Sequence, residues 1–386
     1  MYAPAPFARF GSLIATDLRD VTSDPSALES AGWWAVVADF EGRLLCARFG
    51  DVRGTADQRA PADRRGPADA KGTSDTRPSI PMAPLAAARW RGPGPAAWTS
   101  SMDRDAYTAG VRRIREHIAA GDVYQANLCR VLTAPLPDAS PAASDISGLS
   151  ALLARGNPAP YAGAVRLPAH GVEVATASPE LYLRRSGSTV TSGPIKGTAR
   201  TADGLLEKDH AENVMIVDLV RNDLGRVCAP GTVTVPALCE VEPHPGLVHL
   251  VSTVRGELAP GAGWPELLRH TFPPGSVTGA PKLSALRIID ALETAPRGPY
   301  CGGIGWVDAD RGTGTLAVGI RTFWIERGTS GAVLRFGTGA GITWGSDPEA
   351  EWAETELKAS GLLKVASDMR DPEVPYSTAT SGRRAL

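Results

Sequence analysis

The 386-residue chain has few cysteines and almost no net charge. Its five cysteines, Cys46, Cys129, Cys228, Cys239 and Cys301, lie far apart and include no Cys-x-x-Cys pair. This spacing argues against a zinc site or a disulfide framework and predicts reduced thiols. The formal net charge of −2 gives no support to a nucleic-acid-binding or membrane-surface protein.

Long apolar runs are also missing. No uninterrupted apolar segment is long enough to span a bilayer, and the opening residues MYAPAPFARFGSLIATDLRD lack the charged and then apolar pattern of a secretion signal. We therefore expect a cytoplasmic protein. The hydrophobic share of 43% is that of an ordinary globular chain large enough for one big core or two interlocked ones.

Composition changes along the chain predict its organisation. Residues 52–80 contain no large aliphatic or aromatic side chain inside the segment, so they cannot offset their ordering entropy and are predicted to form a mobile loop. A second loop is predicted over 134–147. We expect an N-terminal β-rich segment over 1–100, a larger domain over 101–368 and a flexible tail over 369–386.

Hydrophobic periodicity and capping residues predict mixed secondary structure. Aromatic and β-branched residues around a break at Glu41-Gly42 predict a hairpin, and Asp103 is placed to cap a helix that ends at Gly121. Further helices are predicted over 208–225, from Pro281 and near Pro348, and strands over 123–132, 232–235, 247–255, 302–308, 315–325 and 333–338. Without a strict βαβ alternation, an α+β fold with antiparallel sheets is favoured.

Three glycine-rich stretches could be mistaken for nucleotide-binding loops. PPGSVTGAPK, GPIKGT and GTGAGIT match neither the Walker A spacing nor the Gly-x-Gly-x-x-Gly spacing. Their backbone N–H groups could instead face a small anion, above all in the loop that leads into the helix at Pro281.

Acidic residues recur at three-residue spacing on two predicted helices. Glu351 and Glu354 lie near the start of the last helix, where Ser346 and Glu349 have capping-box spacing. Alone, such a pair is usually a solvated helix start. Asp209 and Glu212 repeat the spacing on an earlier helix, and two such helices meeting at one point would offer oxygen ligands to Mg²⁺.

Lys196 lies between Pro194 and Gly197, a setting that predicts a turn. From spacing alone it is more often an exposed surface lysine. The alternative is an amine nucleophile presented by that turn.

The order of several longer segments is more specific. GDVYQANL, SPELYL, GPIKGTAR, AENVMIVDLVRNDLGRVC, LVHLVSTVRGEL, TFPPGSVTGAPKLSALRIID, YCGGIGW, AVGIRT and GAGITWGSDPEAEWAETELKA, found between Gly121 and Leu363, together resemble the signature blocks of the chorismate-utilising enzymes. That family includes anthranilate synthase component I, isochorismate and salicylate synthases, and aminodeoxychorismate synthase component I. The resemblance implies the anthranilate synthase component I fold, with antiparallel sheets in a sandwich-like core and helices outside, and makes 101–368 the chorismate-binding catalytic domain.

Two positions distinguish the members of the resembled family. Water-using members carry a lysine base at the position of Gln125, whereas glutamine is typical of ammonia-using members. Anthranilate synthases typically carry alanine at the position of Lys196, whereas Pro-Ile-Lys-Gly-Thr is the pattern in which the lysine is a covalent nucleophile. The resemblance therefore implies amination of chorismate at C4 to 4-amino-4-deoxychorismate, for p-aminobenzoate and folate synthesis.

The resemblance also implies a set of site residues. Glu212 and Glu354 would bind Mg²⁺ directly, with Glu351 and Asp209 acting through water. Glu180 falls at the acid/base position, and His249 at the one that helps to expel pyruvate in related enzymes. The implied substrate contacts are Gly197, Thr198, Tyr300, Arg321, Gly339, Ala340 and Gly341, with Thr278 and Lys282 on the rim.

The chemistry places demands on two of these groups. A carboxylic acid must protonate the departing C4 hydroxyl, so Glu180 is expected to be buried, with a raised pKa. Lys196 must be neutral to attack. Ammonia is expected from a separate glutaminase subunit, because the sequence contains no glutaminase cysteine block.

Two other functions stay open: anthranilate synthase component I, and a non-catalytic subunit that docks to a glutaminase and activates it. Related subunits use the N-terminal region to bind tryptophan. Only Leu28-Glu29-Ser30 resembles such a site here, and none is predicted.

Overall fold

The computed structural model describes residues 5–54, 90–137, 144–199, 201–205, 207–244, 247–329 and 331–367. Most of the loop predicted over 52–80, part of the one predicted over 134–147, and the tail lie outside these residues. Strands β4 and β6 include 52–53 and 134–135, and α2 begins at Ile146, so these ends of the two predicted loops are wrong.

Eighteen strands and six α-helices lie within the described residues. The helices are α1 (Arg104–Ala119), α2 (Ile146–Gly156), α3 (Glu207–Gly225), α4 (Trp264–Thr271), α5 (Lys282–Leu292) and α6 (Pro348–Ala366). The strands are β1 (Phe7–Phe10), β2 (Leu13–Thr22), β3 (Trp33–Ala38), β4 (Leu44–Arg53), β5 (Thr99–Ser100), β6 (Gln125–Pro135), β7 (Tyr161–Leu167), β8 (Val172–Ser178), β9 (Leu181–Ser186), β10 (Thr189–Gly193), β11 (Ile195–Ala199), β12 (Thr234–His244), β13 (Leu247–Glu257), β14 (Gly279–Ala280), β15 (Gly303–Asp308), β16 (Thr313–Val318), β17 (Thr322–Gly328) and β18 (Gly331–Ile342).

Every described strand pair is antiparallel, and the pairs join into one continuous sheet. Its order is β12, β13, β10, β9, β16, β15, β3, β4, β2, β1, β7, β8, β17, β18, β6. β11 adds to β13, and β5 and β14 add to β6. The predicted α+β class with antiparallel pairing is confirmed.

Strands that are far apart in this order contribute side chains to the same hydrophobic cores. The largest cluster of buried side chains combines the N-terminal strands with β7 to β9, β13 and β15 to β17, and helices α3 and α4 cover it. A second cluster lies under α2 and α6, and a third between α1, α5 and β6. Burial of this apolar surface is the main driving force for the fold.

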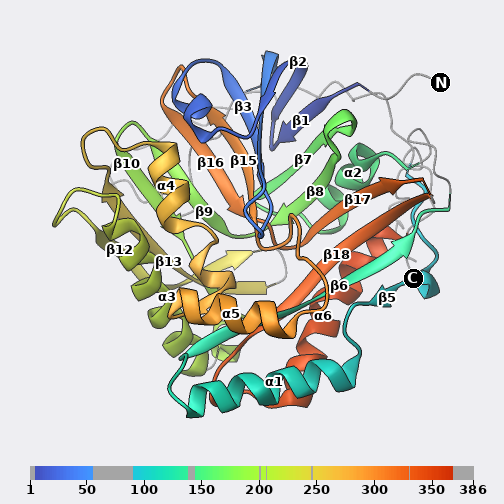
Figure 1. Ribbon diagram of the computed structural model, residues 1–386, viewed down its shortest axis with the longest axis vertical. Helices are drawn as coiled ribbons and strands as arrows, with labels where there is room; N and C mark the ends of the chain where they lie inside the picture. The colour runs from blue at the N-terminus through green and yellow to red at the C-terminus, as the bar shows by residue number, and fades with distance from the viewer. Residues whose placement is uncertain are drawn as a thin grey trace, which may run out of the picture.

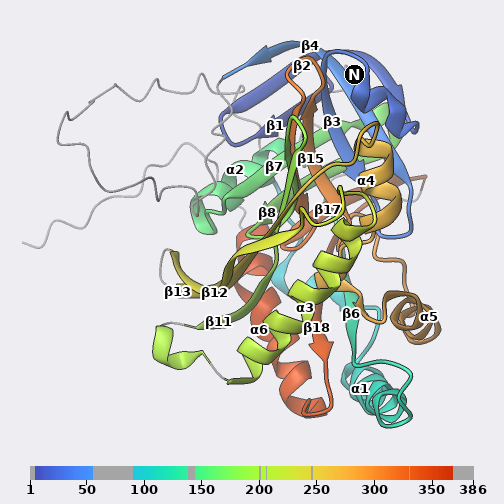
Figure 2. The same ribbon diagram turned by 90° about the vertical axis from the view of Figure 1, so that its left-hand side faces the viewer.

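Figures 1 and 2 show how the elements divide between two ends of the molecule. Strands β1 to β4 lie at one end, and helices α1 and α5 lie at the other. Helix α3 packs on β11 and β13, while α6 packs on β18. Helices α3 and α6, which carry the two predicted pairs of acidic residues, therefore pack on strands β11, β13 and β18.

Local signals explain much of this structure. The hairpin predicted around Glu41-Gly42 is β3 and β4, and the Asp103 carboxylate accepts a hydrogen bond from the Ala106 N–H at 2.8 Å, which caps α1 as predicted. All five cysteines are free, and four of them are buried.

One predicted strand is wrong. The segment over 315–325 forms two strands, β16 and β17, separated by Gly319, Ile320 and Arg321. A Cβ on Gly319 would lie 2.1 Å from the Pro299 carbonyl oxygen. The two backbones therefore approach closely where β16 ends, and Arg321, two residues further on, has φ +52°.

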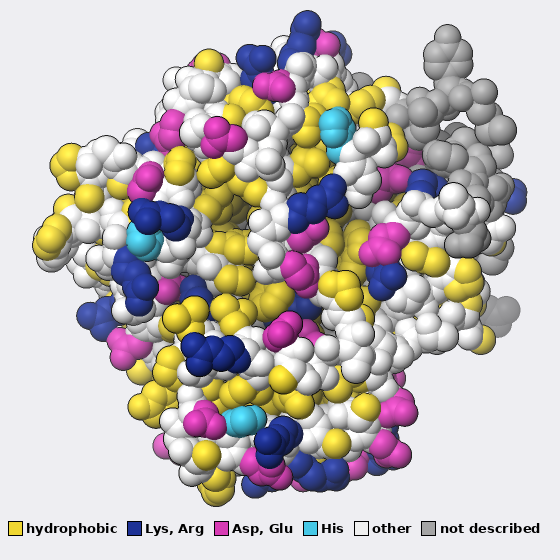
Figure 3. Space-filling view, viewed as in Figure 1, with side chains coloured by type: hydrophobic (Ala, Val, Ile, Leu, Met, Phe, Trp, Pro, Cys, Tyr) yellow, Lys and Arg dark blue, Asp and Glu magenta, His cyan; other side chains and the backbone are white. Residues whose placement is uncertain are grey.

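The face shown in Figure 3 carries interspersed acidic and basic side chains, with hydrophobic ones between them. None of the six helices described combines the length and apolarity needed to cross a membrane.

Candidate active site

A cavity of about 730 Å³ lies between α3, α6 and the strands that connect them. Most of the predicted site residues line it: Glu180, Lys196, Gly197, Asp209, Glu212, His249, Tyr300, Arg321, Gly339, Gly341, Glu351 and Glu354. They are far apart in the sequence, between Glu180 and Glu354, and are brought together where β11, β13 and β18 lie in one sheet beside α3 and α6.

Lys196 reaches this cavity from a strand rather than from the predicted turn, which is a correction. It belongs to β11, whose pairing with β13 shifts register between Ile195 and Thr198. Gly197 supplies φ +79° at this bulge, and a Cβ there would lie 2.8 Å from the Cβ of Asp209. The Lys196 ammonium donates a hydrogen bond to the Ser276 carbonyl oxygen at 3.2 Å. The Thr198 side chain lies outside the described part of the chain.

Glu180 occupies the link between β8 and β9 and is 4% exposed. Burial raises the pKa of its carboxyl to about 7, while hydrogen bonds from Ser276 and the Ile195 N–H and the charge of Lys196 pull the pKa down. The backbone is fixed on both sides, since the Glu180 N–H donates to Ser178 Oγ and its carbonyl accepts from the Val318 N–H. Glu180 is thus buried with a raised pKa, as predicted from the sequence.

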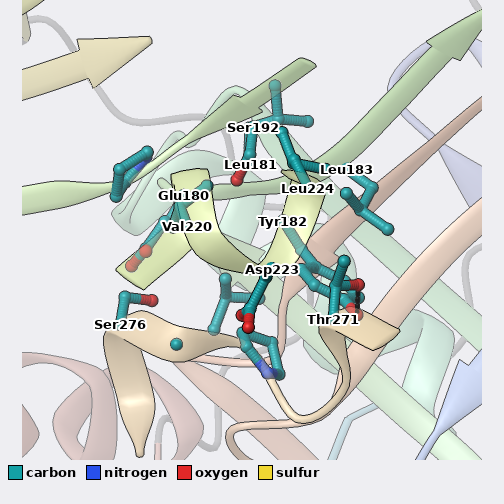
Figure 4. Close-up of a pocket in the computed structure, with 14 residues that line it drawn as sticks. Glu180, Leu181, Tyr182, Leu183, Ser192, Val220, Asp223, Leu224, Thr271 and Ser276 are labelled. Atoms are coloured by element: carbon teal, nitrogen blue, oxygen red, sulfur yellow. Dashed lines mark hydrogen bonds between the residues drawn. The ribbon is translucent and has the colours of Figure 1, made fainter. Parts of the chain in front are cut away.

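A second cavity of about 20 Å³ lies behind Glu180 and is lined mainly by apolar side chains (Figure 4). Leu181, Val220 and Leu224 contribute to it from β9 and α3. These side chains keep water away from this side of the carboxyl group, which accounts for the large effect of burial on its pKa.

Four carboxylates enter the large cavity from two helices. Asp209 and Glu212 come from α3, and Glu351 and Glu354 from α6. Burial raises the pKa of Glu212, and the negative charge of Glu354 adds to the increase. Burial acts to raise the pKa of Glu354, but the Lys358 ammonium at 2.6 Å, together with the charges of Lys208 and Lys196, lowers it overall.

The donor set fits a hard cation in its chemistry, since all four groups offer carboxylate oxygens. Among the described residues, no three Asp, Glu, His or Cys side chains converge on one point. The carboxylates therefore form two facing acidic walls rather than a closed cage. Lys208 and Lys358 lie in the same cavity and partly neutralise these walls.

The start of α6 differs from the predicted capping box. Asp347 is the N-cap, and its carboxylate accepts hydrogen bonds from the N–H groups of Glu349 and Ala350 at 3.1 and 2.9 Å. Ser346 instead accepts from the Thr343 N–H and hydrogen-bonds to Glu351, whose pKa burial raises. The shift by one residue follows from Pro348, which is pre-organised for the first helical turn.

Three predicted substrate contacts do not line the cavity. The Lys282 ammonium forms an ion pair with Asp223 at 2.6 Å and donates to the Thr271 and Pro273 carbonyls at 2.9 Å each. Thr278 is fully buried, and its hydroxyl donates to backbone carbonyls of its own turn. Ala340 is buried against the third core cluster. For Lys282, internal partners satisfy the charge that was expected to face the substrate.

Gln125 lies against the cavity and not on its surface. Its side chain is 1% exposed, and Oε1 has no hydrogen-bond partner. A Cβ on Gly341 would lie 2.1 Å from Gln125 Nε2 and 3.5 Å from Lys196 Nζ. The amide and the amine therefore flank the same glycine, with an unsatisfied acceptor beside them.

The remaining predicted residues, Arg321, His249 and Tyr300, give the cavity a positive charge and polar side chains. Arg321 projects from the break between β16 and β17, and burial lowers its pKa. His249 on β13 and Tyr300 are both buried, and the Tyr300 hydroxyl lies 3.9 Å from Cys129 Sγ.

Sequence reasoning missed Ser276, Lys208, Lys358 and Asn127, all of which line the cavity. Lys358 follows Glu354 by four residues and Lys208 precedes Glu212 by four, so helical spacing could have indicated both. Ser276 gave no such signal, because its contacts are with residues distant in sequence.

The sequence also matches a family of known proteins. A family model described as chorismate binding enzyme matches residues 54–364. The chain therefore belongs to the chorismate binding enzyme family.

Its relatives carry two names. It is 42% identical over 292 residues to anthranilate synthase component 1 of Streptomyces coelicolor, covering 72% of this chain and 55% of the relative. It is 38% identical over 279 residues to aminodeoxychorismate synthase component 1 of Klebsiella aerogenes, covering 69% and 59%. The chain thus spans less than two thirds of the length of each relative.

The fold is also that of a solved structure. The menaquinone-specific isochorismate synthase of Escherichia coli superimposes with a TM-score of 0.70 at 18% identity, covering 94% of this chain and 89% of that one. This likeness confirms the expected fold.

Proposed function

We propose that the protein aminates chorismate at C4 with ammonia to give 4-amino-4-deoxychorismate, through a covalent adduct on Lys196. One observation carries the proposal: the Lys196 amine lies inside the cavity, next to the protonatable Glu180 and the buried amide of Gln125. An amine nucleophile, an acid and a polar amide are the groups that two successive displacements need.

The steps balance with these groups. The neutral Lys196 amine forms a bond to C2, both double bonds of the ring diene shift, and the C4–O bond breaks as Glu180 protonates the hydroxyl and water leaves. Ammonia then forms a bond to C4, both double bonds shift back, and the C2–N bond to Lys196 breaks. The ammonium formed at C4 returns one proton to the Glu180 carboxylate, so the enzyme is restored. The enolpyruvyl group is retained, and chorismate plus ammonia gives product plus water.

Charge in the cavity supports binding of a dianion. Arg321 provides fixed positive charge, and Lys208 and Lys358 offset part of the negative charge of the four carboxylates. We infer that Glu212 and Glu354 would hold Mg²⁺ directly, with Glu351 and Asp209 acting through water. When bound, the ion would anchor the ring carboxylate and withdraw electron density from the diene.

Gln125 suits ammonia better than water activation. Its amide has no basic group to deprotonate a water molecule, whereas the unpaired Oε1 can accept an N–H of ammonia. We propose that a separate glutaminase subunit supplies this ammonia and that the product serves p-aminobenzoate and folate synthesis.

The second candidate is anthranilate synthase component I, and the 42% identity to a protein of that name favours it. One assay separates the two: purified protein with chorismate, Mg²⁺ and excess ammonium salt, with products identified by mass. A chorismate-derived amine that retains the enolpyruvyl group supports the proposal, and anthranilate with pyruvate overturns it. No turnover, even with a competent glutaminase added, would favour the non-catalytic docking subunit.

A further inference from the structure

Ser276 contacts both proposed reacting groups at once. It belongs to the short 3-10 turn Gly275–Val277 and is 7% exposed. Its carbonyl oxygen accepts a hydrogen bond from Lys196 Nζ at 3.2 Å, and its hydroxyl hydrogen-bonds to the Glu180 carboxyl. Figure 4 shows the Ser276 and Glu180 side chains side by side, and both residues also line the large cavity.

The turn that carries Ser276 is held by neighbours that do not use its side chain. The Arg297 guanidinium donates to the Val277 carbonyl at 2.8 Å, and the Asn127 N–H donates to the Thr278 carbonyl at 2.7 Å. Gly275 packs against α3 so closely that a Cβ would lie 2.9 Å from Leu219 Cδ2. Removal of the Ser276 hydroxyl should therefore leave the turn in place.

A hydroxyl is suited to a carboxyl group that changes protonation state. It can donate to the ionised carboxylate and can rotate to accept from the protonated acid. The backbone carbonyl can only accept, so it holds an N–H of Lys196 in either charge state and leaves the lone pair of the neutral amine free to point elsewhere.

We propose that Ser276 is a positioning residue for the amination, which fixes the distance between Glu180 and Lys196 and supports both protonation states of the acid. This inference rests on the proposed function. It deepens that function by assigning the link between the acid and the amine to one residue.

The charged groups that surround Glu180 decide in which direction its pKa moves when the Ser276 hydroxyl is removed. Lys196 on β11 acts on it directly, His249 on β13 lines the same cavity, and the Asp223–Lys282 pair of α3 and α5 lies beside the small cavity behind it. Removal of the Ser276 hydroxyl leaves these charged groups in place, but the Glu180 carboxyl group loses a hydrogen bond that favours its ionised form. The pKa of Glu180 should therefore rise.

The test compares wild type, Ser276→Ala and Ser276→Thr in the chorismate assay at a constant concentration of free ammonia, from pH 6 to 9. For Ser276→Ala we expect the alkaline limb of kcat to move up by roughly half to one pH unit and kcat to fall about tenfold. KM for chorismate should change less than about twofold, because Ser276 is not proposed to bind the substrate. Threonine should restore the wild-type limb.

A second measurement works without turnover. We expect the unfolding free energy of the metal-free protein to fall more between pH 5 and pH 8 in Ser276→Ala than in wild type, and this difference to vanish when Glu180→Gln is also present. An unmoved alkaline limb together with an unchanged stability profile would overturn the role of Ser276. Absence of chorismate turnover in the wild type would instead overturn the proposed function.

Discussion

Gly341 lies directly against the side-chain amide of Gln125, and no side chain fits between them. A Cβ at position 341 would lie 2.1 Å from Gln125 Nε2. Neither backbone can retreat, because β18 and β6 are paired at this point, with Gly341 opposite Asn127. The empty space at this glycine is therefore part of the site.

We expect Gly341→Ala to displace Gln125 and to lower kcat/KM for ammonia-dependent chorismate consumption by roughly a hundredfold, since misplacement by about 1 Å can cost that much. Steady-state kinetics with ammonium salt measure it. Gly345→Ala is the matched control, because no atom lies within 4 Å of its Cβ position. Equal rates in the two variants would show that Gln125 does not need this space.

Lys196→Ala should abolish amination at C4, with a loss of about three orders of magnitude in kcat, because the covalent route needs the amine. Product analysis by mass measures it. Lys364→Ala removes an exposed lysine from the last turn of α6 and should leave the rate unchanged. Production of the C4 amine by Lys196→Ala at the wild-type rate would eliminate the covalent mechanism.

The raised pKa of Glu180 predicts two pH effects. The acid loses its proton as pH rises through about 7, so the rate should fall above that value. Stability follows the same direction: the folded protein binds this proton more tightly than the unfolded chain, so the contribution is complete below about 4.5 and is lost as pH rises through about 7.

The contribution of Glu180 to this loss is on the order of 3 kcal/mol in the metal-free protein, at about 1.4 kcal/mol per pH unit. Glu180→Gln should flatten the dependence of unfolding free energy on pH over that range. Urea denaturation at several pH values measures it. Parallel curves for the variant and the wild type would mean that Glu180 ionises normally in the fold.

Neutralisation of Glu212, one of the four cavity carboxylates, should raise the stability of the metal-free protein and reduce the stabilisation by metal. Burial and the charge of Glu354 both disfavour the ionised form of Glu212, so metal-free Glu212→Gln should melt roughly 2 °C higher than wild type. The stabilisation that wild type gains from added Mg²⁺ should be largely lost in the variant. Thermal unfolding with EDTA or with Mg²⁺ measures both effects.

Glu349→Gln is the control for that experiment, since Glu349 is exposed at the start of α6 and pairs with Arg104. It should keep the full response to Mg²⁺. An undiminished response in Glu212→Gln would remove Glu212 from the metal site.

The sequence predicted those elements whose signals are local. Asp103, Gly121 and the periodic apolar residues between them delimit α1 without reference to the rest of the chain. Tertiary contacts decided the cases that failed. The break after β16 arises where Gly319 meets the Pro299 backbone, and the bulge at Lys196 arises where Gly197 meets Asp209. Neither neighbour is close in sequence.

The sequence predicted those site residues that lie within the motifs resembling the chorismate-utilising enzymes. The motif resemblance indicated Lys196, Glu180 and the four helix carboxylates, and these line one cavity. It could not indicate that Asp223 captures Lys282, since such pairing depends on how α3 meets α5. For the same reason, Ser276 became visible only in three dimensions.

The burial of Arg297 makes the N-terminal hairpin a support for the chemistry. Its guanidinium holds the carbonyls of Asn127 and Val277, lies 4.1 Å over the ring of Phe40, and its backbone N–H donates to Glu41. Two different nitrogens make these contacts, Nη1 to Val277 and Nη2 to Asn127, in the fixed planar geometry of a guanidinium that a lysine ammonium lacks. Shortening the turn between β3 and β4 would thus weaken the support of Asn127 and Val277 while leaving every residue that lines the large cavity in the chain.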